Sequence, residues 1–388
     1  MKNPKELGIN TQCVHVGEVK DEQFKGAVSP VYMSTSYAFD QVDVKRYPRY
    51  LNTPNQEALC KKIAILEHTE DALIFSSGMA AISAALFAFL QKGDHVILQQ
   101  VIYGGTYNFV AKEFDKYGIE YSYTESNAID DFEELIQPNT KVIYIETPSN
   151  PLLGVTDIKA ISELAKERRI LTMIDNTFAS PINQNPADFG IDIILHSATK
   201  YMGGHSDISA GAVAASEEHT VRIWETAINY GGNLSDFMVW MLERSLKTLN
   251  LRVKEQTKNA QVIAEYLEES PHIDRVYYPG LKSHPDYELA KEQMKGFGAM
   301  MSFELTEGID AMEFQQALQL IKPSMSLAGL ESTTVSPAQT THALLSEEER
   351  LERGIRQGLI RFSTGIEEPE DLIADIEQAI LKTKKELV

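Results

Sequence analysis

The chain has 388 residues, 43% of them hydrophobic, so it can bury a large core as two domains or as one large domain with an appendage. It carries 36 lysines and arginines against 56 aspartates and glutamates, a formal net charge of -20, which argues against nucleic acid or an anionic membrane as a partner. The longest apolar run, residues 79–90, is too short to cross a bilayer as a helix.

The N-terminal sequence and the cysteines point to a cellular compartment. The first residues, MKNPKELGIN, contain no apolar segment of the kind found in signal peptides. The two cysteines, Cys13 and Cys60, are far apart and lack the spacing of metal ligands. We therefore expect a cytoplasmic protein without disulfides.

Helical patterns and short apolar runs alternate from about residue 56 onward. Residues 56–68 place Leu59, Ile63 and Leu66 on one face of a helix. Two further helices are expected at 106–118 and 157–169. Between the helices lie strands that read as buried on both faces, at 72–75, 95–98, 141–146, 170–175 and 191–195. This alternation predicts a mostly parallel sheet with helices on both sides.

The pattern changes after about residue 243. Helices are expected at 251–270 and 308–321, strands at 298–305 and 358–364, and a closing helix that begins at Pro369, where a missing amide costs least. The first 50 residues lack this periodicity. We therefore divide the chain into an arm that contacts a neighbouring subunit (1–50), an α/β domain (51–243) and a smaller α+β domain (244–388).

Small residues follow several of the strands, at the sheet edge where ligands bind in such folds. Ser76, Ser77 and Gly78 lead into a helix, where free amides make an anion site, although an ordinary helix cap would look the same. The turns YGGT after Tyr103 and TPSNP around Asn150 are open to the same two interpretations.

Two charged residues complete a recognisable set. Asp175 ends an apolar strand, and a buried acid there should face a cation or a protonated nitrogen. Lys200 follows among small hydroxylated residues, in HSATK. Pyridoxal phosphate (PLP) requires an anion cup, an aromatic ring face, a carboxylate for its ring nitrogen and a lysine for its aldehyde. Singly each residue has a structural explanation, but together they predict a PLP site.

The sequence resembles the Cys/Met metabolism (transsulfuration) enzymes that depend on PLP, which include cystathionine γ-lyase, methionine γ-lyase, cystathionine γ-synthase and homoserine-ester sulfhydrylases. The resemblance covers nearly the whole chain, because eight separated segments occur in the family's order: SSGMAAI, YGGT, ETPSNPLL, DNTF, HSATKYMGGHSD, YPGLKSHP, SLAGLES and GLIRFSTGIE. It implies the aspartate aminotransferase-like fold (fold type I), with a mostly parallel seven-stranded sheet and a smaller α+β domain.

The resemblance also implies roles for particular residues. Lys200 is then the Schiff-base lysine, Asp175 the partner of the ring nitrogen and Tyr103 the stacking ring, which is also a candidate proton donor. The phosphate cup is formed by Gly78, Met79, Ser197 and Thr199, completed by Tyr47 and Arg49 from a neighbouring subunit. Arg361 grips the substrate carboxylate, helped by Asn150 and Ser326.

The function that we expect is elimination of the γ-substituent of cystathionine or methionine, giving a 2-oxo acid, ammonia and a thiol, in a homotetramer built as a dimer of dimers. A γ-synthase or sulfhydrylase, which replaces the γ-substituent, is the nearer alternative, and a non-catalytic binding protein is the remote one. We expect no metal, since cofactor binding already accounts for the segment that holds His196, His205 and Asp207.

Four positions depart from the family's pattern. Met325 stands where cystathionine-specific members carry glutamate, and Gly105 where many methionine γ-lyases carry cysteine. The family's NPT after the arginine is LNTPN here, and its HPA segment reads VSPA. We expect broad tolerance of γ-substituents, because an apolar Met325 offers no partner to the distal ammonium of cystathionine.

Overall fold

The structure is a computed structural model that describes residues 3–42, 44–340, 346–352 and 354–384. Its larger sheet has seven strands in the order β1-β7-β6-β5-β4-β2-β3. Only β7 runs antiparallel to its neighbours, so the predicted mostly parallel seven-stranded sheet is confirmed. The strands are β1 (Asp71–Phe75), β2 (His95–Leu98), β3 (Glu120–Tyr123), β4 (Thr140–Glu146), β5 (Leu171–Asp175), β6 (Ile193–His196) and β7 (Gly211–Ala215).

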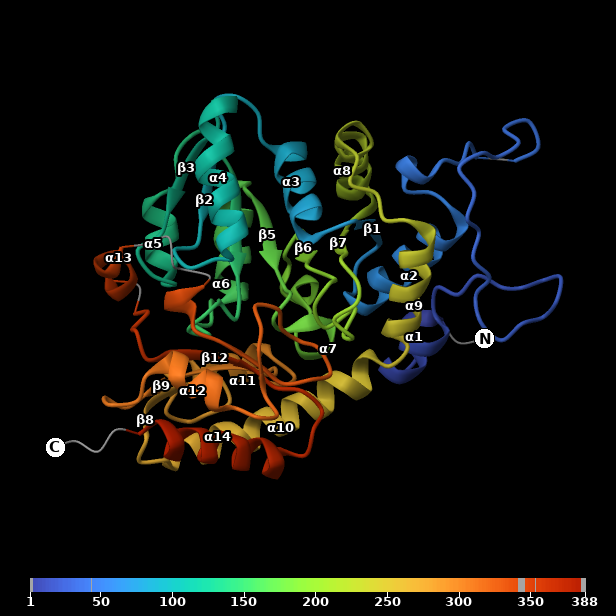
Figure 1. The fold of residues 1–388 in the computed structure, drawn as a ribbon. Helices are drawn as coiled ribbons and strands as arrows, with labels where there is room; N and C mark the ends of the chain where they lie inside the picture. Colours follow the sequence, from blue (N-terminus) through green and yellow to red (C-terminus); the bar gives the residue numbers. More distant parts are fainter. Residues whose placement is uncertain (1–2, 43, 341–345, 353, 385–388) are drawn as a thin grey trace.

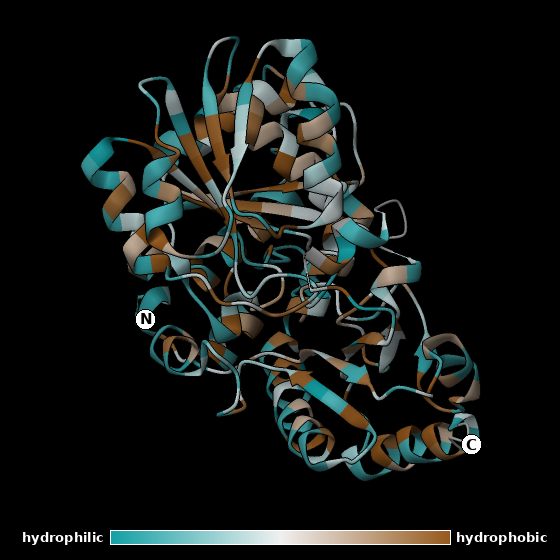
Figure 2. Ribbon diagram, turned by 90° about the vertical axis from the view of Figure 1, so that its left-hand side faces the viewer, coloured by the Kyte–Doolittle hydropathy of each residue, from teal (hydrophilic) through white to brown (hydrophobic). Residues whose placement is uncertain are grey.

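Helices cover both faces of this sheet (Figure 1). Side chains alternate along each strand, so Leu73 and Phe75 pack with one set of helices while Ala72 and Ile74 pack with the other. The first set is α3 (Gly78–Phe89), α4 (Gly104–Tyr117) and α8 (Glu217–Tyr230), and the second includes α2 (Pro54–Leu66) and α6 (Ile158–Arg168). Figure 2 shows the result, with apolar strands at the centre and polar residues on the outer helices.

A second sheet of five strands lies below the first in Figure 1, in the order β10-β11-β12-β9-β8. Its strands are β8 (Ile273–Tyr277), β9 (Met300–Leu305), β10 (Lys322–Pro323), β11 (Thr333–Val335) and β12 (Leu359–Ser363). The long helix α10 (Leu249–Glu269) and helix α12 (Ala311–Ala317) pack on it, and α14 (Pro369–Thr383) packs against both of these helices. The expected α+β character of this part is confirmed, with α14 starting at Pro369 as predicted.

The remaining elements are short or connect these layers. They are α1 (Ile9–His15), α5 (Ile129–Glu134), α7 (Ser180–Asn183), α9 (Asp236–Leu246), α11 (Tyr287–Gln293) and α13 (Glu347–Glu352), with 3-10 turns η1 (Pro4–Glu6), η2 (Pro48–Tyr50), η3 (Pro186–Phe189) and η4 (Pro337–Gln339). Within the described ranges, no helix combines the length and the apolar character that crossing a bilayer requires.

One predicted helix was too long. The pattern over 308–321 predicts a single helix, but α12 ends at Ala317 and Leu318 is extended. The next three amides, of Gln319, Leu320 and Ile321, donate to the Asp375 carboxylate of α14 at 2.8–2.9 Å. Those amides would have bonded within the helix, so a contact with a distant residue ends it.

The first 50 residues are not wholly irregular. Helix α1 packs against α2 and α10, and its Cys13 carbonyl accepts a 2.6 Å hydrogen bond from the buried ammonium of Lys62. The described residues between α1 and η2 form turns and irregular chain that extends from the body in Figure 1. The domain boundaries at 50 and 243 remain a prediction.

Candidate active site

Three parallel strands end in polar residues at the same edge of the large sheet. Glu146 ends β4, Asp175 ends β5 and His196 ends β6. Glu146 and Asp175 are paired in register, so their two carboxyl groups come from neighbouring positions on adjacent strands. Both are buried, with exposed fractions of 4% and 6%. This is the edge at which α/β folds bind ligands.

Asp175 is held by the turn that follows it. One carboxylate oxygen accepts the backbone N–H of Thr177 at 3.0 Å. Burial raises the pKa of Asp175, while its hydrogen bonds to Thr177 and the nearby His196 act in the opposite direction. A buried carboxyl of this kind gains most from a cation or a protonated nitrogen placed beside it.

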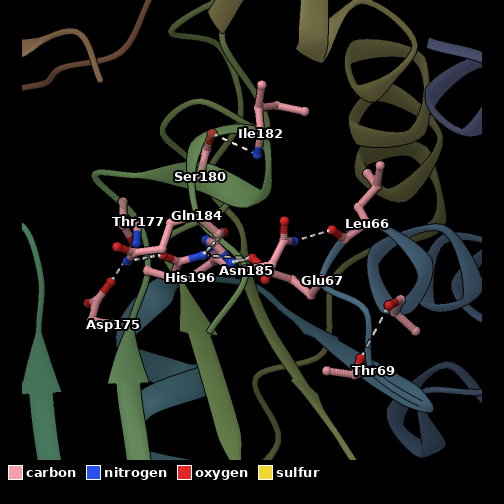
Figure 3. A network of polar contacts seen from close by, with 12 residues as sticks. Leu66, Glu67, Thr69, Asp175, Thr177, Ser180, Ile182, Gln184, Asn185 and His196 are labelled. Atoms are coloured by element: carbon pink, nitrogen blue, oxygen red, sulfur yellow. Dashed lines mark hydrogen bonds and ion pairs between the residues drawn. The ribbon is translucent and has the colours of Figure 1, made fainter. Parts of the chain in front are cut away.

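His196 belongs to a buried network that lies beside Asp175 and Thr177 (Figure 3). Its Nε2 bonds Glu67, whose Oε1 also accepts from the Asn176 amide at 3.0 Å. Gln184 donates to Asn176 at 2.9 Å and to the Thr147 carbonyl at 3.0 Å. The network ties α2 to the ends of β4, β5 and β6. In the described part of the chain, no group of three or more His, Cys, Asp or Glu side chains is placed to hold a metal ion.

Lys200 lies in the loop between β6 and β7. The loop is fixed at Ser197, whose N–H donates to Thr177 Oγ1 at 2.8 Å, and at Thr199, whose hydroxyl and backbone bond Ala210. Lys200 Nζ donates to Ser326 Oγ at 3.4 Å. Burial lowers the pKa of Lys200, and the charge of Arg361 lowers it further. The amine is therefore biased toward its neutral, nucleophilic form.

The start of α3 approaches this loop closely. Ser77 caps the helix by accepting the Ala80 N–H at 3.1 Å. A Cβ on Gly78 would lie 2.9 Å from Ser197 Cβ, so only glycine allows the two segments to meet. Amides in the first helical turn have no acceptor within the helix, so those of Gly78 and Met79 are available to an anion beside Ser197. These groups fit a phosphate.

Arg361 projects from β12 of the second sheet and is almost fully buried, with 3% of its surface exposed. It donates to Asn150 Oδ1 at 3.1 Å and to the Met325 carbonyl at 3.3 Å. Burial lowers its pKa to about 10, and the carboxyl of Glu146 opposes that shift. Arg361 remains a cation at neutral pH.

Tyr103 precedes α4 and is 46% exposed. Its backbone N–H donates to Glu146 Oε2 at 2.6 Å. Glu146 was not among the site residues predicted from sequence, although it is the last residue of the predicted strand 141–146. A charged residue that ends an apolar strand was the same signal that marked Asp175.

Tyr47 and Arg49 do not join the other predicted site residues. They lie at η2, where Arg49 bonds the Ile228 carbonyl of α8 and its guanidinium lies 5.3 Å from the Tyr50 ring centroid. The contacts described above connect most of the other predicted site residues within one chain: Asn150, Asp175, Ser197, Lys200, Ser326 and Arg361. Gly78 lies close to Ser197, and the Tyr103 N–H bonds Glu146. The roles predicted for Tyr47 and Arg49 therefore remain a prediction, which requires a second subunit.

A doubly wound sheet that presents a half-buried lysine, a strand-end carboxyl and a helix N-terminus at its carboxyl edge is the architecture of a PLP-dependent enzyme of fold type I. The model of the Cys/Met metabolism PLP-dependent enzyme family matches residues 10–381, and the chain belongs to that family. Its cofactor is PLP.

Relatives within the family differ in activity. The chain is 45% identical to a cystathionine β-lyase of Lactococcus lactis over 96% of this chain and 99% of that one. It is 43% identical to a cystathionine γ-lyase of Bacillus subtilis, over 95% and 98% of the two chains. A solved cystathionine γ-synthase of Xanthomonas oryzae superposes with a TM-score of 0.93 at 37% identity, covering 97% of this chain and 98% of that one.

Proposed function

We propose that this enzyme is a carbon–sulfur lyase that eliminates the γ-substituent of cystathionine or methionine. The observation that supports it most directly is the position of Lys200. Its amine donates a hydrogen bond to Ser326 and is close enough to Arg361 for that charge to lower its pKa. A base for the α-carbon and a cation for the α-carboxylate are thereby placed together. These are the groups that an amino-acid substrate needs.

The cofactor site that we propose uses the groups already described. Gly78, Met79, Ser197 and Thr199 would hold the phosphate, Tyr103 would provide the stacking ring, Asp175 would pair with the ring nitrogen and Lys200 would bind the aldehyde. When bound, PLP supplies an electron sink for the negative charge that develops at the substrate's α-carbon. Tyr47 and Arg49 of a second subunit complete the phosphate site.

The remaining residues bind the substrate and move protons. Arg361 binds the α-carboxylate by paired hydrogen bonds, with Asn150 and Ser326 fixing its orientation. Lys200 Nζ takes the proton from the α-carbon, gives it up to the cofactor, which would hold it, and only then takes one from the β-carbon. After the sulfur has left, Lys200 returns that second proton to the γ-carbon. The Tyr103 hydroxyl gives a proton to the leaving sulfur, and water releases the 2-oxo acid and ammonia.

Cleavage on the other side of the cystathionine sulfur is a second candidate, favoured by the 45% identity to the Lactococcus lactis β-lyase. Replacement of the γ-substituent by a thiol is a third, since the Xanthomonas oryzae γ-synthase shares the fold. A non-catalytic role is the remote alternative, and the presence of Lys200, Asp175, Tyr103 and Arg361 argues against it.

Product analysis separates these reactions. The purified holoenzyme is supplied with cystathionine, methionine, cysteine or an acyl homoserine, each with and without an added thiol. Cysteine with 2-oxobutanoate from cystathionine supports γ-elimination, whereas homocysteine with pyruvate identifies β-elimination. A new thioether formed only with added thiol identifies replacement. The Lys200→Ala variant serves as the blank.

The proposal includes a cytoplasmic homotetramer built as a dimer of dimers. It rests on the resemblance of Tyr47 and Arg49 to the family's intersubunit pair, and Arg49 bonds the Ile228 carbonyl of α8 rather than the lysine loop of its own chain. A monomer would lack two groups of the phosphate site and should bind PLP weakly.

A further inference from the structure

The N-terminus of α4 is capped from another strand. Tyr103 occupies the N-cap position, but its own side chain makes no capping hydrogen bond. The Tyr103 N–H instead donates to Glu146 Oε2 at 2.6 Å, and Glu146 is 4% exposed. A carboxylate at a helix N-terminus is favoured both by this bond and by the helix dipole. Glu146 therefore holds the backbone from which the Tyr103 ring projects.

Glu146 is itself rigidly held. Its N–H donates to Gln99 Oε1 at 3.2 Å, and Gln99 Nε2 donates to the Glu146 carbonyl at 3.0 Å. Gln99 is fully buried and also accepts from the Thr156 hydroxyl at 3.0 Å. This two-way bond joins the ends of β2 and β4, so the Glu146 carboxyl projects from a fixed base.

The position of the Tyr103 ring is also limited by its neighbours. A Cβ on Gly105 would lie 2.4 Å from Tyr103 Cε1 and 3.1 Å from Met79 Sδ. The ring thus occupies the space that any side chain at position 105 would need, beside Met79 at the start of α3. The departure from the family's cysteine at this position has a physical consequence, since it leaves room for the ring.

We propose that Glu146 is a positioning residue, which places the Tyr103 ring over the cofactor site by holding its backbone, with Gly105 leaving the space that the ring fills. The inference rests on the role proposed above for Tyr103. Glu146 makes no hydrogen bond to Lys200, but its carboxyl also accepts the backbone N–H of Asn150 and lies close to the charge of Arg361. The experiments must therefore separate an effect that passes through Tyr103 from one on these substrate groups.

The surroundings of Glu146 define a suitable conservative variant. Burial and the adjacent Asp175 raise its pKa well above the ordinary value, while the Tyr103 N–H and the Arg361 charge favour the ionised form. Glutamine keeps a carbonyl oxygen that can accept the Tyr103 N–H and removes the charge. Alanine removes both. Comparing Glu146→Gln with Glu146→Ala therefore separates the hydrogen bond from the charge.

The first experiment needs no turnover. Amide hydrogen exchange is followed in the peptide that contains Tyr103, with and without PLP. Glu146→Ala should speed that exchange by about tenfold, as expected for the loss of a backbone hydrogen bond, and Glu146→Gln by much less. Circular dichroism of bound PLP should change in Glu146→Ala and in Gly105→Ala, because both move the stacking ring.

The second experiment is a double-mutant cycle on kcat. Glu146→Ala should lower kcat by about 100-fold, the loss that a displaced catalytic group can cause. Adding Tyr103→Phe to Glu146→Ala should cost far less than adding it to the wild-type enzyme, because a displaced hydroxyl contributes little. The matched control is Glu304→Gln, a buried carboxylate of β9 that bonds Tyr277 at 2.6 Å. It should leave both measurements unchanged.

Two results would overturn the inference. One is unchanged exchange at Tyr103 together with an unchanged cofactor signal in Glu146→Ala. The other is full additivity of Glu146→Ala and Tyr103→Phe. If the enzyme turns over none of the sulfur amino acids, the proposed function fails, while the exchange and dichroism measurements still decide the role of Glu146.

Discussion

Arg361 donates a hydrogen bond to Asn150 at 3.1 Å, although 211 residues separate them. Arg361 comes from β12 of the small sheet and Asn150 from the turn after β4 of the large one. Lys200 Nζ likewise donates to Ser326 Oγ at 3.4 Å, and these two residues are 126 positions apart in the sequence. The candidate substrate site is therefore a junction between the two sheets, and each sheet supplies half of it.

Lys200 should carry the cofactor. Borohydride reduction of the holoenzyme, followed by peptide mapping, should find a pyridoxyl group on Lys200, because its half-buried amine bonds Ser326 and has a lowered pKa. Lys62, also buried and with a pKa lowered to about 8, serves as an internal comparison. An adduct on Lys62 or on any other lysine would refute the assignment.

Gly78→Ala should weaken PLP binding. The added Cβ would lie 2.9 Å from Ser197 Cβ and push α3 away from the lysine loop, so we expect the dissociation constant to rise by about tenfold, the effect of ~1.4 kcal/mol. Equilibrium dialysis of the apoprotein measures it. Gly8→Ala, where a Cβ meets nothing within 4 Å, is the control and should bind PLP normally. Equal affinity in both variants contradicts the proposed cup.

Capture of PLP by the apoprotein should depend on pH through Lys200. Only the neutral amine attacks the aldehyde, so the rate should rise with pH around a midpoint below 10.5, the ordinary value for lysine, because burial and then Arg361 lower the pKa. Removing the cation in Arg361→Leu should move the midpoint upward, since the ammonium is then less disfavoured. The exposed Arg275, changed to leucine, should leave it in place. An unchanged midpoint in Arg361→Leu would show that Arg361 does not act on Lys200, and a downward shift would contradict the sign that we expect.

Met325→Glu should shift specificity toward cystathionine. The Met325 carbonyl accepts from Arg361, so the side chain begins next to the substrate site, but it is 64% exposed. An exposed ion pair contributes up to ~1 kcal/mol, so we expect the ratio of kcat/KM for cystathionine over methionine to rise by about fivefold. Met325→Gln, which is polar but uncharged, is the control. If the unmodified enzyme already prefers cystathionine by orders of magnitude, another residue supplies the contact.

Arg49 should act across a subunit boundary. Arg49→Ala and Lys200→Ala should each be inactive, and mixed, reassembled subunits should regain part of the activity because one hybrid site then holds both groups. Native mass spectrometry of differently tagged subunits confirms exchange. Exchange without recovered activity would place Arg49 and Lys200 in the same site of one chain.

Much of the fold was predictable because its signals are local. The strands β2, β4 and β5 read as unbroken apolar runs since helices bury both of their faces, and the start of α3 follows from the cap at Ser77. Strand β7 was missed, because its sequence, GAVAA, consists of small residues with no clear period. Its antiparallel direction is set by the neighbours β1 and β6 rather than by its own residues.

The residues of the candidate site also fall into those that local sequence signals predict and those that only the tertiary structure reveals. Asp175, Lys200 and Gly78 could be predicted from sequence, since each signal lies within a few consecutive residues: a charged residue that ends an apolar strand, a lysine among small hydroxylated residues and a glycine that starts a helix. That Glu146 caps α4, that Ser326 meets Lys200 and that Met325 stays exposed was decided only by tertiary structure. Contacts between residues more than 40 positions apart depend on how separate strands and sheets pack, and no local pattern encodes that packing.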